Sequence, residues 1–284
     1  MTVTAKANQT SASTSPILTH KQDGVTTLIM NTPERLNGWT KEMMDALKEG
    51  FRVAAGDDET IVLVLTGADP YYCAGVDLSA VLHPGHPRKL HATIVELNRV
   101  LFDAFLDFPK PLLVAVNGPA IGASVTSATL CDGIIASEKA TFSTPFTALG
   151  IPPEGCSNVH FARIMGQANA ERMLGKEGWR PTGEEALEAG LIQWVAPHEK
   201  LGEETHRIAQ KWLASGAKRG FRGGSERDEL KAVNARESVA LADAFLSAPF
   251  IKAQFQFLWS KKKRGPAATF LAMLITRPLW SRLL

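Results

Sequence analysis

In Leu112-Leu-Val-Ala-Val-Asn-Gly-Pro-Ala-Ile-Gly-Ala-Ser-Val-Thr126, a short apolar run leads into a turn and then into small residues. The run at 112–116 has the length and composition of a strand buried on both faces, as in parallel sheets. Asn, Gly and Pro at 117–122 predict the turn, and 123–130 predicts a short helix. A second apolar run at 133–136 predicts the next strand. Strand, helix and strand in this order indicate a βαβ unit and an α/β fold.

The same alternation continues outward from this unit. Upstream, the pattern predicts strands at 25–30 and 61–66, a helix after Thr40 and another at 91–105. Downstream, helical patterns dominate, at 168–175, 183–189, 200–214 and 226–246, and a Gly/Ser/Arg-rich stretch at 215–225 predicts a flexible link. We therefore expect a leader at 1–16, a core at 17–197 and a helical C-terminal region at 198–284.

Composition and charge limit the classes of function. The chain of 284 residues is 45% hydrophobic and 21% charged, with a net charge of +2, which gives no general attraction to nucleic acid or membrane. No apolar run is long enough to span a bilayer. Three cysteines without metal-ligand spacing, Cys73, Cys131 and Cys156, predict no metal site and a reducing, intracellular location. The leader is expected to be disordered, and an extra Leu after Ser281-Arg-Leu breaks a peroxisome-like address.

Glu154 lies at an unusual position for a carboxylate. Pro152 and Pro153 precede it, Gly155 follows it, and a helical pattern begins at Ser157. The prolines end any strand and the glycine permits a turn. Glu154 is therefore expected at a loop-to-helix junction among apolar neighbours, either as a functional group or as a first-turn acid favoured by the helix dipole.

Two glycine-containing loops each follow a predicted strand. They are Tyr71-Tyr-Cys-Ala-Gly-Val-Asp-Leu78 and Asn117-Gly-Pro-Ala-Ile-Gly-Ala-Ser-Val125. Loops that open a helix leave backbone N–H groups free to face a ligand. Two such groups that converge can form an oxyanion hole.

Taken together, these stretches resemble the crotonase (enoyl-CoA hydratase/isomerase) superfamily. The segments at 117–126, 140–146, 153–157 and 232–237 are most similar to the peroxisomal-type Δ3,Δ2-enoyl-CoA isomerases. The resemblance implies a ββα spiral core, a C-terminal helical trimerisation region and a homotrimer or hexamer. It also implies an acyl-CoA thioester as substrate and no separate cofactor, because coenzyme A is part of that substrate. The implied location is the peroxisome in a eukaryote and the cytoplasm in a bacterium.

The resemblance assigns roles to particular residues. Glu154 would be the catalytic base, and the backbone N–H groups of Val76 and Ala123 would hold the thioester oxygen. Arg35 and Asn37 would lie at the nucleotide end of the substrate, with backbone contacts expected there. The remaining implied substrate contacts are Cys73, Ala74, Gly75, Asp77, Leu78, Gly122 and Phe146.

Two departures from the family pattern point to one reaction. Hydratases of this family use two carboxylates, and the corresponding positions here hold Thr126 and Phe146. Neither side chain exchanges a proton usefully at neutral pH. The sequence therefore predicts an isomerase that uses a single Glu, of the kind needed in β-oxidation of unsaturated fatty acids.

Other interpretations stay open at this stage. Cys156 and His160 are four residues apart on a predicted helix and could form a thioester-cleaving pair. A hydratase and a non-catalytic acyl-CoA-binding protein are further alternatives. Asp77 and Asp132 are expected to have structural roles. The apolar residues of 255–275 predict a subunit contact or a lid.

Overall fold

A computed structural model describes residues 15–77 and 85–284; the predicted leader up to residue 14 and the predicted contact at Leu78 lie outside this range. The strands are β1 (Ile17–Gln22), β2 (Val25–Met30), β3 (Val62–Gly67), β4 (Leu112–Val116), β5 (Ala120–Ile121), β6 (Gly133–Ser137), β7 (Phe142–Ser143) and β8 (Trp194–Ala196). The α-helices are α1 (Lys41–Gly56), α2 (Pro87–Asp107), α3 (Ala123–Thr129), α4 (Phe146–Leu149), α5 (Ser157–Leu174), α6 (Gly183–Glu188), α7 (Leu201–Ala214), α8 (Arg227–Phe245), α9 (Ala248–Ser260) and α10 (Arg264–Trp280).

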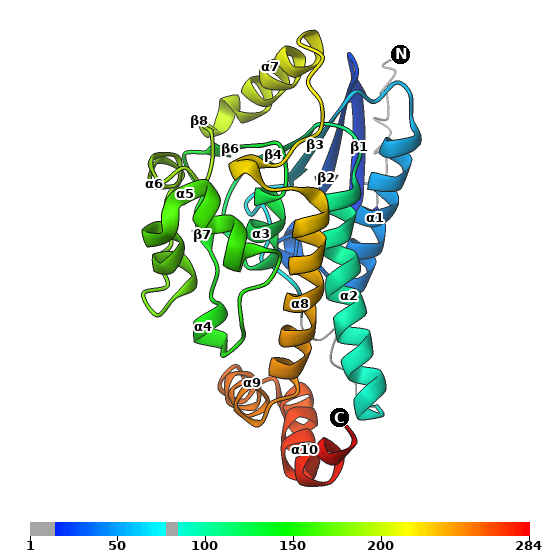
Figure 1. The fold of residues 1–284 in the computed structure, drawn as a ribbon, viewed down its shortest axis with the longest axis vertical. Coiled ribbons are helices and arrows are strands. Elements are labelled where there is room, and N and C mark those ends of the chain that lie inside the picture. Colours follow the sequence, from blue (N-terminus) through cyan, green and yellow to red (C-terminus); the bar gives the residue numbers. More distant parts are fainter. Residues whose placement is uncertain (1–14, 78–84) are drawn as a thin grey trace, which may run out of the picture.

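The main sheet has six strands in the order β1-β2-β3-β4-β6-β8 (Figure 1). The pair β1–β2 is antiparallel, and every later neighbour is parallel. In this register Leu65 lies opposite Val114, and Val114 lies opposite Ile134. The short strands β5 and β7 form a second, two-stranded parallel sheet. The predicted α/β class is confirmed.

Both faces of the main sheet are covered, as the apolar runs predicted. Leu63 and Leu65 of β3 belong to a buried cluster shared with α1, α2 and α3. Val62 and Val64, which point to the opposite face, pack with Ile208 and other side chains of α7. Helix α7 lies in the predicted C-terminal helical region, and it nevertheless covers the sheet.

The boundaries of several elements differ from the sequence expectation. Helix α2 begins four residues earlier than expected, with Pro87 in its first turn, where the missing N–H of proline costs no hydrogen bond. Strand β1 was not predicted, because its last four residues are polar and exposed and give no apolar alternation. Helix α5 begins at Ser157 and is kinked at Gly166, which has φ +78°.

The prediction of a flexible link at 215–225 is wrong at Arg219. Its guanidinium donates to Asp132 at 3.0 Å and to the carbonyls of Phe105 and Leu130. The side chains of Arg219 and Asp132 are only 4% and 12% exposed. Asp132 also accepts hydrogen bonds from Leu112 N–H and Gly220 N–H, so its predicted structural role is confirmed.

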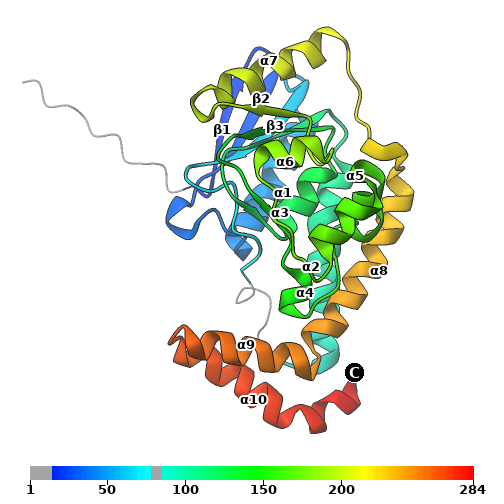
Figure 2. The ribbon, with the colours of Figure 1, turned by 90° about the vertical axis from the view of Figure 1, so that its left-hand side faces the viewer.

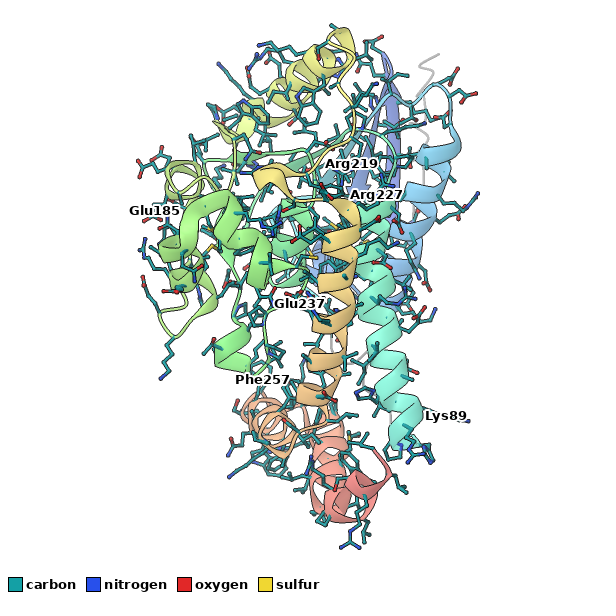
Figure 3. All side chains as sticks on the ribbon, in the orientation of Figure 1. Lys89, Glu185, Arg219, Arg227, Glu237 and Phe257 are labelled. Carbon is teal, nitrogen blue, oxygen red and sulfur yellow. The ribbon has the colours of Figure 1, made fainter. Side chains whose placement is uncertain are left out.

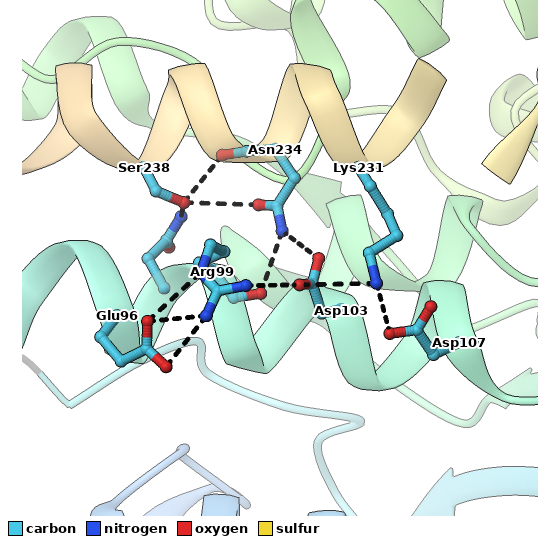
Figure 4. A network of polar contacts seen from close by, with 8 residues as sticks. Glu96, Arg99, Asp103, Asp107, Lys231, Asn234 and Ser238 are labelled. Atoms are coloured by element: carbon cyan, nitrogen blue, oxygen red, sulfur yellow. Dashed lines mark hydrogen bonds and ion pairs between the residues drawn. The ribbon is translucent and has the colours of Figure 1, made fainter. Parts of the chain in front are cut away.

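Helices α2 and α8 run side by side and carry the C-terminal part of the molecule (Figures 1 and 2). Polar groups fix their register, as Figure 4 shows: Asn234 donates to Asp103 and to the Arg99 carbonyl, and Lys231 pairs with Asp107 at 2.6 Å. Helices α9 and α10 form a hairpin at the end of the molecule remote from α7 (Figure 2). Of the described helices, none combines the length and the apolar character needed to cross a membrane.

Candidate active site

A cavity of about 140 Å³ lies where the two glycine loops meet α2, α8 and the segment that precedes α5. Among the described residues that line it, Asn98 and Glu154 carry the polar side chains and the rest are apolar or glycine. Such a cavity suits an apolar ligand whose polar reacting part faces a few fixed groups.

The turn that presents Glu154 is held on both sides. Gly155 and Cys156 both adopt left-handed backbone conformations, each with φ +66°. A Cβ atom on Gly155 would lie 2.5 Å from both Phe102 and the Thr126 hydroxyl, so the backbone approaches these side chains as closely as glycine allows. The Ser157 hydroxyl donates to the Glu154 carbonyl at 2.7 Å. The carboxylate is therefore fixed at the cavity wall.

Burial controls the protonation of Glu154. Its side chain is 4% exposed. Burial, and secondarily the charge of Glu237, raises its pKa to about 8, against a weaker opposing effect of a hydrogen bond from Thr126. Glu154 can therefore both accept and release a proton near neutral pH.

Val76 and Ala123, whose backbone N–H groups the sequence proposed as an oxyanion hole, both line this cavity. Val76 pairs with Trp39 through the flanking bonds Trp39 N–H to Gly75 and Asp77 N–H to Trp39, a pattern that leaves its own N–H unused. Ala123 is the first residue of α3, where an N–H has no intrahelical acceptor. Within residues 15–77 and 85–284, neither N–H donates to another group.

The two glycine loops are joined directly. Ile121 N–H donates to the Cys73 carbonyl at 3.0 Å. Gly75 has φ +88°, and a Cβ atom there would lie 2.8 Å from the Ile121 carbonyl oxygen. A glycine is therefore needed at 75 for the loops to bring Val76 and Ala123 to one cavity.

The structure brings together seven of the residues that the sequence proposed as a site. The cavity lining includes Ala74, Gly75, Val76, Gly122, Ala123, Phe146 and Glu154. Their roles in binding and catalysis stay predictions.

Other proposed substrate contacts lie away from the cavity lining. The Asn37 side chain is fully buried, accepts from Thr32 N–H and donates to the carbonyls of Ala68 and Tyr71, so it braces the backbone. Cys73 is also fully buried, and burial raises the pKa of its thiol to about 12. Arg35 is exposed in a single turn of 3-10 helix, and Asp77 donates its N–H to Trp39.

The two positions that hold carboxylates in hydratases have other chemistry here. Phe146 forms part of the apolar cavity wall. The Thr126 hydroxyl, which is fully buried, lies 3.4 Å from Oε1 of Glu154. Glu154 is therefore the carboxylate among the described lining residues.

The interpretation of Cys156 and His160 as a thioester-cleaving pair is wrong. Both His160 nitrogens are occupied, by the Ser225 hydroxyl and the Thr129 carbonyl, and burial lowers the pKa of the imidazole to about 4. The Cys156 thiol faces the Leu230 carbonyl, and burial raises its pKa. The two side chains thus point to different partners, and neither lines the cavity.

Sequence reasoning missed the walls contributed by distant helices. Met44 comes from α1, and the α8 contributions are Leu241 and Phe245; those of α2 are Ile94, Leu97, Asn98 and Leu101. The helical spacing of the α2 side chains indicated an apolar face but not that this face borders a cavity. Sequence reasoning also gave no role to Glu237, a buried carboxylate of α8.

The spiral α/β core with its C-terminal helices and paired glycine loops defines a crotonase-type protein. The family model for enoyl-CoA hydratase/isomerase matches residues 20–238, and the chain belongs to that family of enzymes. A human protein named enoyl-CoA delta isomerase 2 is 38% identical over 249 residues, which cover 85% of this chain and 63% of that protein. The match thus spans less than two thirds of the human relative.

Two further relatives agree with this assignment. A mouse protein named enoyl-CoA delta isomerase 3, peroxisomal, is 33% identical over 276 residues, which cover 90% of this chain and 82% of that protein. The crystal structure of an enoyl-CoA hydratase/isomerase from Pseudoalteromonas atlantica superposes with a TM-score of 0.71 at 28% identity, covering 87% of this chain and 97% of that one.

Proposed function

We propose that this chain is a Δ3,Δ2-enoyl-CoA isomerase that moves the double bond of a 3-enoyl-CoA to the 2-trans position. The observation that carries the proposal is Glu154, the one carboxylate among the described residues that line a nearly apolar cavity, together with Val76 and Ala123 in the same lining, whose N–H groups have no acceptor within residues 15–77 and 85–284. The names of the human and mouse relatives support the same reaction.

In the proposed mechanism, the ionised Glu154 takes a proton from C2 of the 3-enoyl thioester. The electron pair of that C–H bond moves into the thioester, and negative charge develops on its oxygen. The N–H groups of Val76 and Ala123 stabilise this charge in a site with little water, where one donor contributes about 3 kcal/mol. The protonated Glu154 then returns the proton to C4, and the double bond ends between C2 and C3.

The raised pKa of Glu154 suits both halves of this cycle. A carboxylate with a pKa of about 8 is a stronger base than an ordinary glutamate and can still release its proton to the dienolate. In this proposal Glu154 reaches both C2 and C4 of the substrate from one cavity. The reaction therefore requires no second acid or base.

Coenzyme A enters this proposal as part of the substrate, with no separate cofactor. The exposed loop that carries Arg35 is the proposed contact for the nucleotide end. A homotrimer or hexamer and an intracellular location, peroxisomal in a eukaryote, belong to the proposal, and the name of the mouse relative supports the location.

The test is an assay of the protein with a 3-enoyl-CoA, compared with its Glu154→Gln variant. The parent should form 2-trans-enoyl-CoA. The variant should lose at least about 10²-fold in kcat, the usual contribution of a general base, while acyl-CoA still binds. Near-normal turnover by the variant would refute the role of Glu154. Release of free thiol would indicate a hydrolase, and binding without turnover by the parent would indicate a non-catalytic protein.

A further inference from the structure

We propose that Glu237 is a positioning residue that holds the turn carrying Glu154 and keeps Glu154 a strong base. The proposal rests on the proposed isomerase function for its catalytic consequence. Its structural part, the coupling of two buried carboxylates, can be measured without any substrate.

The geometry comes from the N-terminus of α5. Cys156 is the N-cap of this helix and gives it no side-chain hydrogen bond. Instead, Oε2 of Glu237 accepts the Cys156 N–H at 2.6 Å, and its Oε1 accepts the Asn158 N–H at 3.4 Å. A carboxylate from α8 thus caps a helix that begins three residues after Glu154, at the end where the dipole favours negative charge.

The position of Glu237 along α8 is itself fixed. The next residue, Ser238, accepts a hydrogen bond from Asn98 of α2 at 3.0 Å, and Asn234 donates to Asp103 one turn earlier (Figure 4). Figure 3 shows Glu237 on α8, midway along the molecule. The α2–α8 register therefore sets where the cap of α5 lies, and with it the turn that presents Glu154.

Glu237 is the carboxylate of this pair whose ionised form is better stabilised. Its side chain is 4% exposed, and burial raises its pKa to about 7, which the N–H groups of Cys156 and Asn158 counteract. Within the described part of the chain, the long contact with Thr126 is the one hydrogen bond to the Glu154 carboxylate. Glu237 therefore ionises first, and its charge opposes ionisation of Glu154.

Other ionisable groups of the described chain also act on this region. Arg236 on α8 acts on Glu237, and Asp103 of α2 acts, like both carboxylates, on the Cys156 thiol. Glu237 is absent from the cavity lining, so it does not contact the space assigned to the substrate. It must act through Glu154 and the turn, which makes it a positioning residue and not a catalytic one.

The test is a pH titration of side-chain carboxyl carbons in the free protein labelled with ¹³C-glutamate. The signal that disappears in Glu154→Gln identifies Glu154. In Glu237→Gln, which keeps an acceptor for Cys156 N–H and removes the charge, the Glu154 midpoint should fall by about one pH unit. The matched control is Glu229→Gln on the same helix, where the carboxylate pairs with Arg163 at the surface, and it should leave the midpoint unchanged.

Kinetics provide the second measurement. Glu237→Gln should move the acid limb of the kcat profile to lower pH by the same amount and lower the kcat plateau several-fold, since the base is weaker. An unchanged titration midpoint with a lowered melting temperature would mean a purely structural cap and would overturn the proposal.

A second variant, Glu237→Asp, keeps the proposal testable if Glu237→Gln does not fold. Glu237→Asp keeps the charge and shortens the reach to Cys156, so it should retain the high Glu154 midpoint while kcat falls. A midpoint that returned to an ordinary glutamate value in Glu237→Asp would overturn the proposal. If the midpoint moves in Glu237→Gln but the parent never isomerises 3-enoyl-CoA, the carboxylate coupling is supported and the proposed function fails instead.

Discussion

The hydroxyl of Thr126 lies 3.4 Å from Oε1 of Glu154 and 3.2 Å from the Ala123 carbonyl oxygen. One hydroxyl proton cannot serve both acceptors fully, so the carboxylate gains little from it. Thr126 also stands at a position where hydratases of this family carry a carboxylate. Thr126 therefore leaves Glu154 as a poorly stabilised anion, which favours proton uptake over water activation.

Replacement of Glu154 by Gln should stabilise the fold at alkaline pH. The folded-state pKa of Glu154, about 8, lies above the ordinary value of 4.5, so the folded protein holds this proton more tightly than the unfolded chain. The free energy of unfolding contributed by this group is complete below about pH 4.5 and is lost as pH rises through 8. The neutral Gln escapes that loss, which is on the order of a few kcal/mol.

Thermal melts at several pH values check this prediction. The melting temperatures of parent and variant should nearly coincide at pH 5, and the variant should melt several degrees higher at pH 9. Glu229→Gln, an exposed change on α8, serves as the control for charge effects in general. A difference that did not grow between pH 5 and pH 9 would contradict an elevated Glu154 pKa.

Hydration of a 2-enoyl-CoA should be at least about 10²-fold slower than isomerisation of a 3-enoyl-CoA. A hydratase must hold and activate water with a second carboxylate, and Thr126 and Phe146 occupy those positions. The measurement is product analysis for 3-hydroxyacyl-CoA under conditions that give complete isomerisation. Comparable rates of the two reactions would show that water is activated by another group.

The protein should form a trimer, or a dimer of trimers, in solution. On the α9–α10 hairpin, Phe257, Trp259, Ile275 and Leu279 are 51–76% exposed in the single chain. Large apolar side chains exposed to this extent on one hairpin favour a covering partner surface. Light scattering at micromolar concentration should give at least three times the chain mass, and Ile275→Asp with Leu279→Asp should lower it.

Val53→Asp is the matched control for that experiment. Val53 is 49% exposed on α1, apart from the hairpin, so its replacement should leave the assembly mass unchanged. A monomer mass for the parent protein would refute the predicted assembly.

The sequence predicted the parts of the molecule whose signal is local. The apolar runs of β3 and β4, the glycine turns at 75 and 122 and the junction at Glu154 each depend on a few adjacent residues, and the structure places them as expected. The α2 and α8 walls of the cavity depend instead on how two helices far apart in sequence align. That register comes from pairs such as Asn234 with Asp103, which no local pattern reveals.

Two polar residues illustrate the same limit more sharply. Arg219 stands in a stretch whose composition is typical of a flexible link, yet its fixed position comes from Asp132 and two carbonyls distant in sequence. Glu237 has the helical surroundings of an ordinary surface glutamate, yet it caps another helix. In both, a single long-range partner decides the environment, so composition predicts the opposite.

Substitutions at Ala123 separate its backbone donor from its side chain. Ala123→Gly keeps the N–H, whereas Ala123→Pro removes it. Proline is well accommodated at the first residue of a helix, and the Ala123 N–H donates to nothing within residues 15–77 and 85–284. The Pro variant is therefore expected to fold, and its melting curve is measured beside the kinetics. If this N–H stabilises the thioester oxygen in the transition state, Pro should lose about 3 kcal/mol, or 10²–10³-fold in kcat, and Gly much less. A folded Pro variant that isomerises as fast as the parent would mean that the 117–125 loop shapes the cavity without donating, and the oxygen would then depend on Val76.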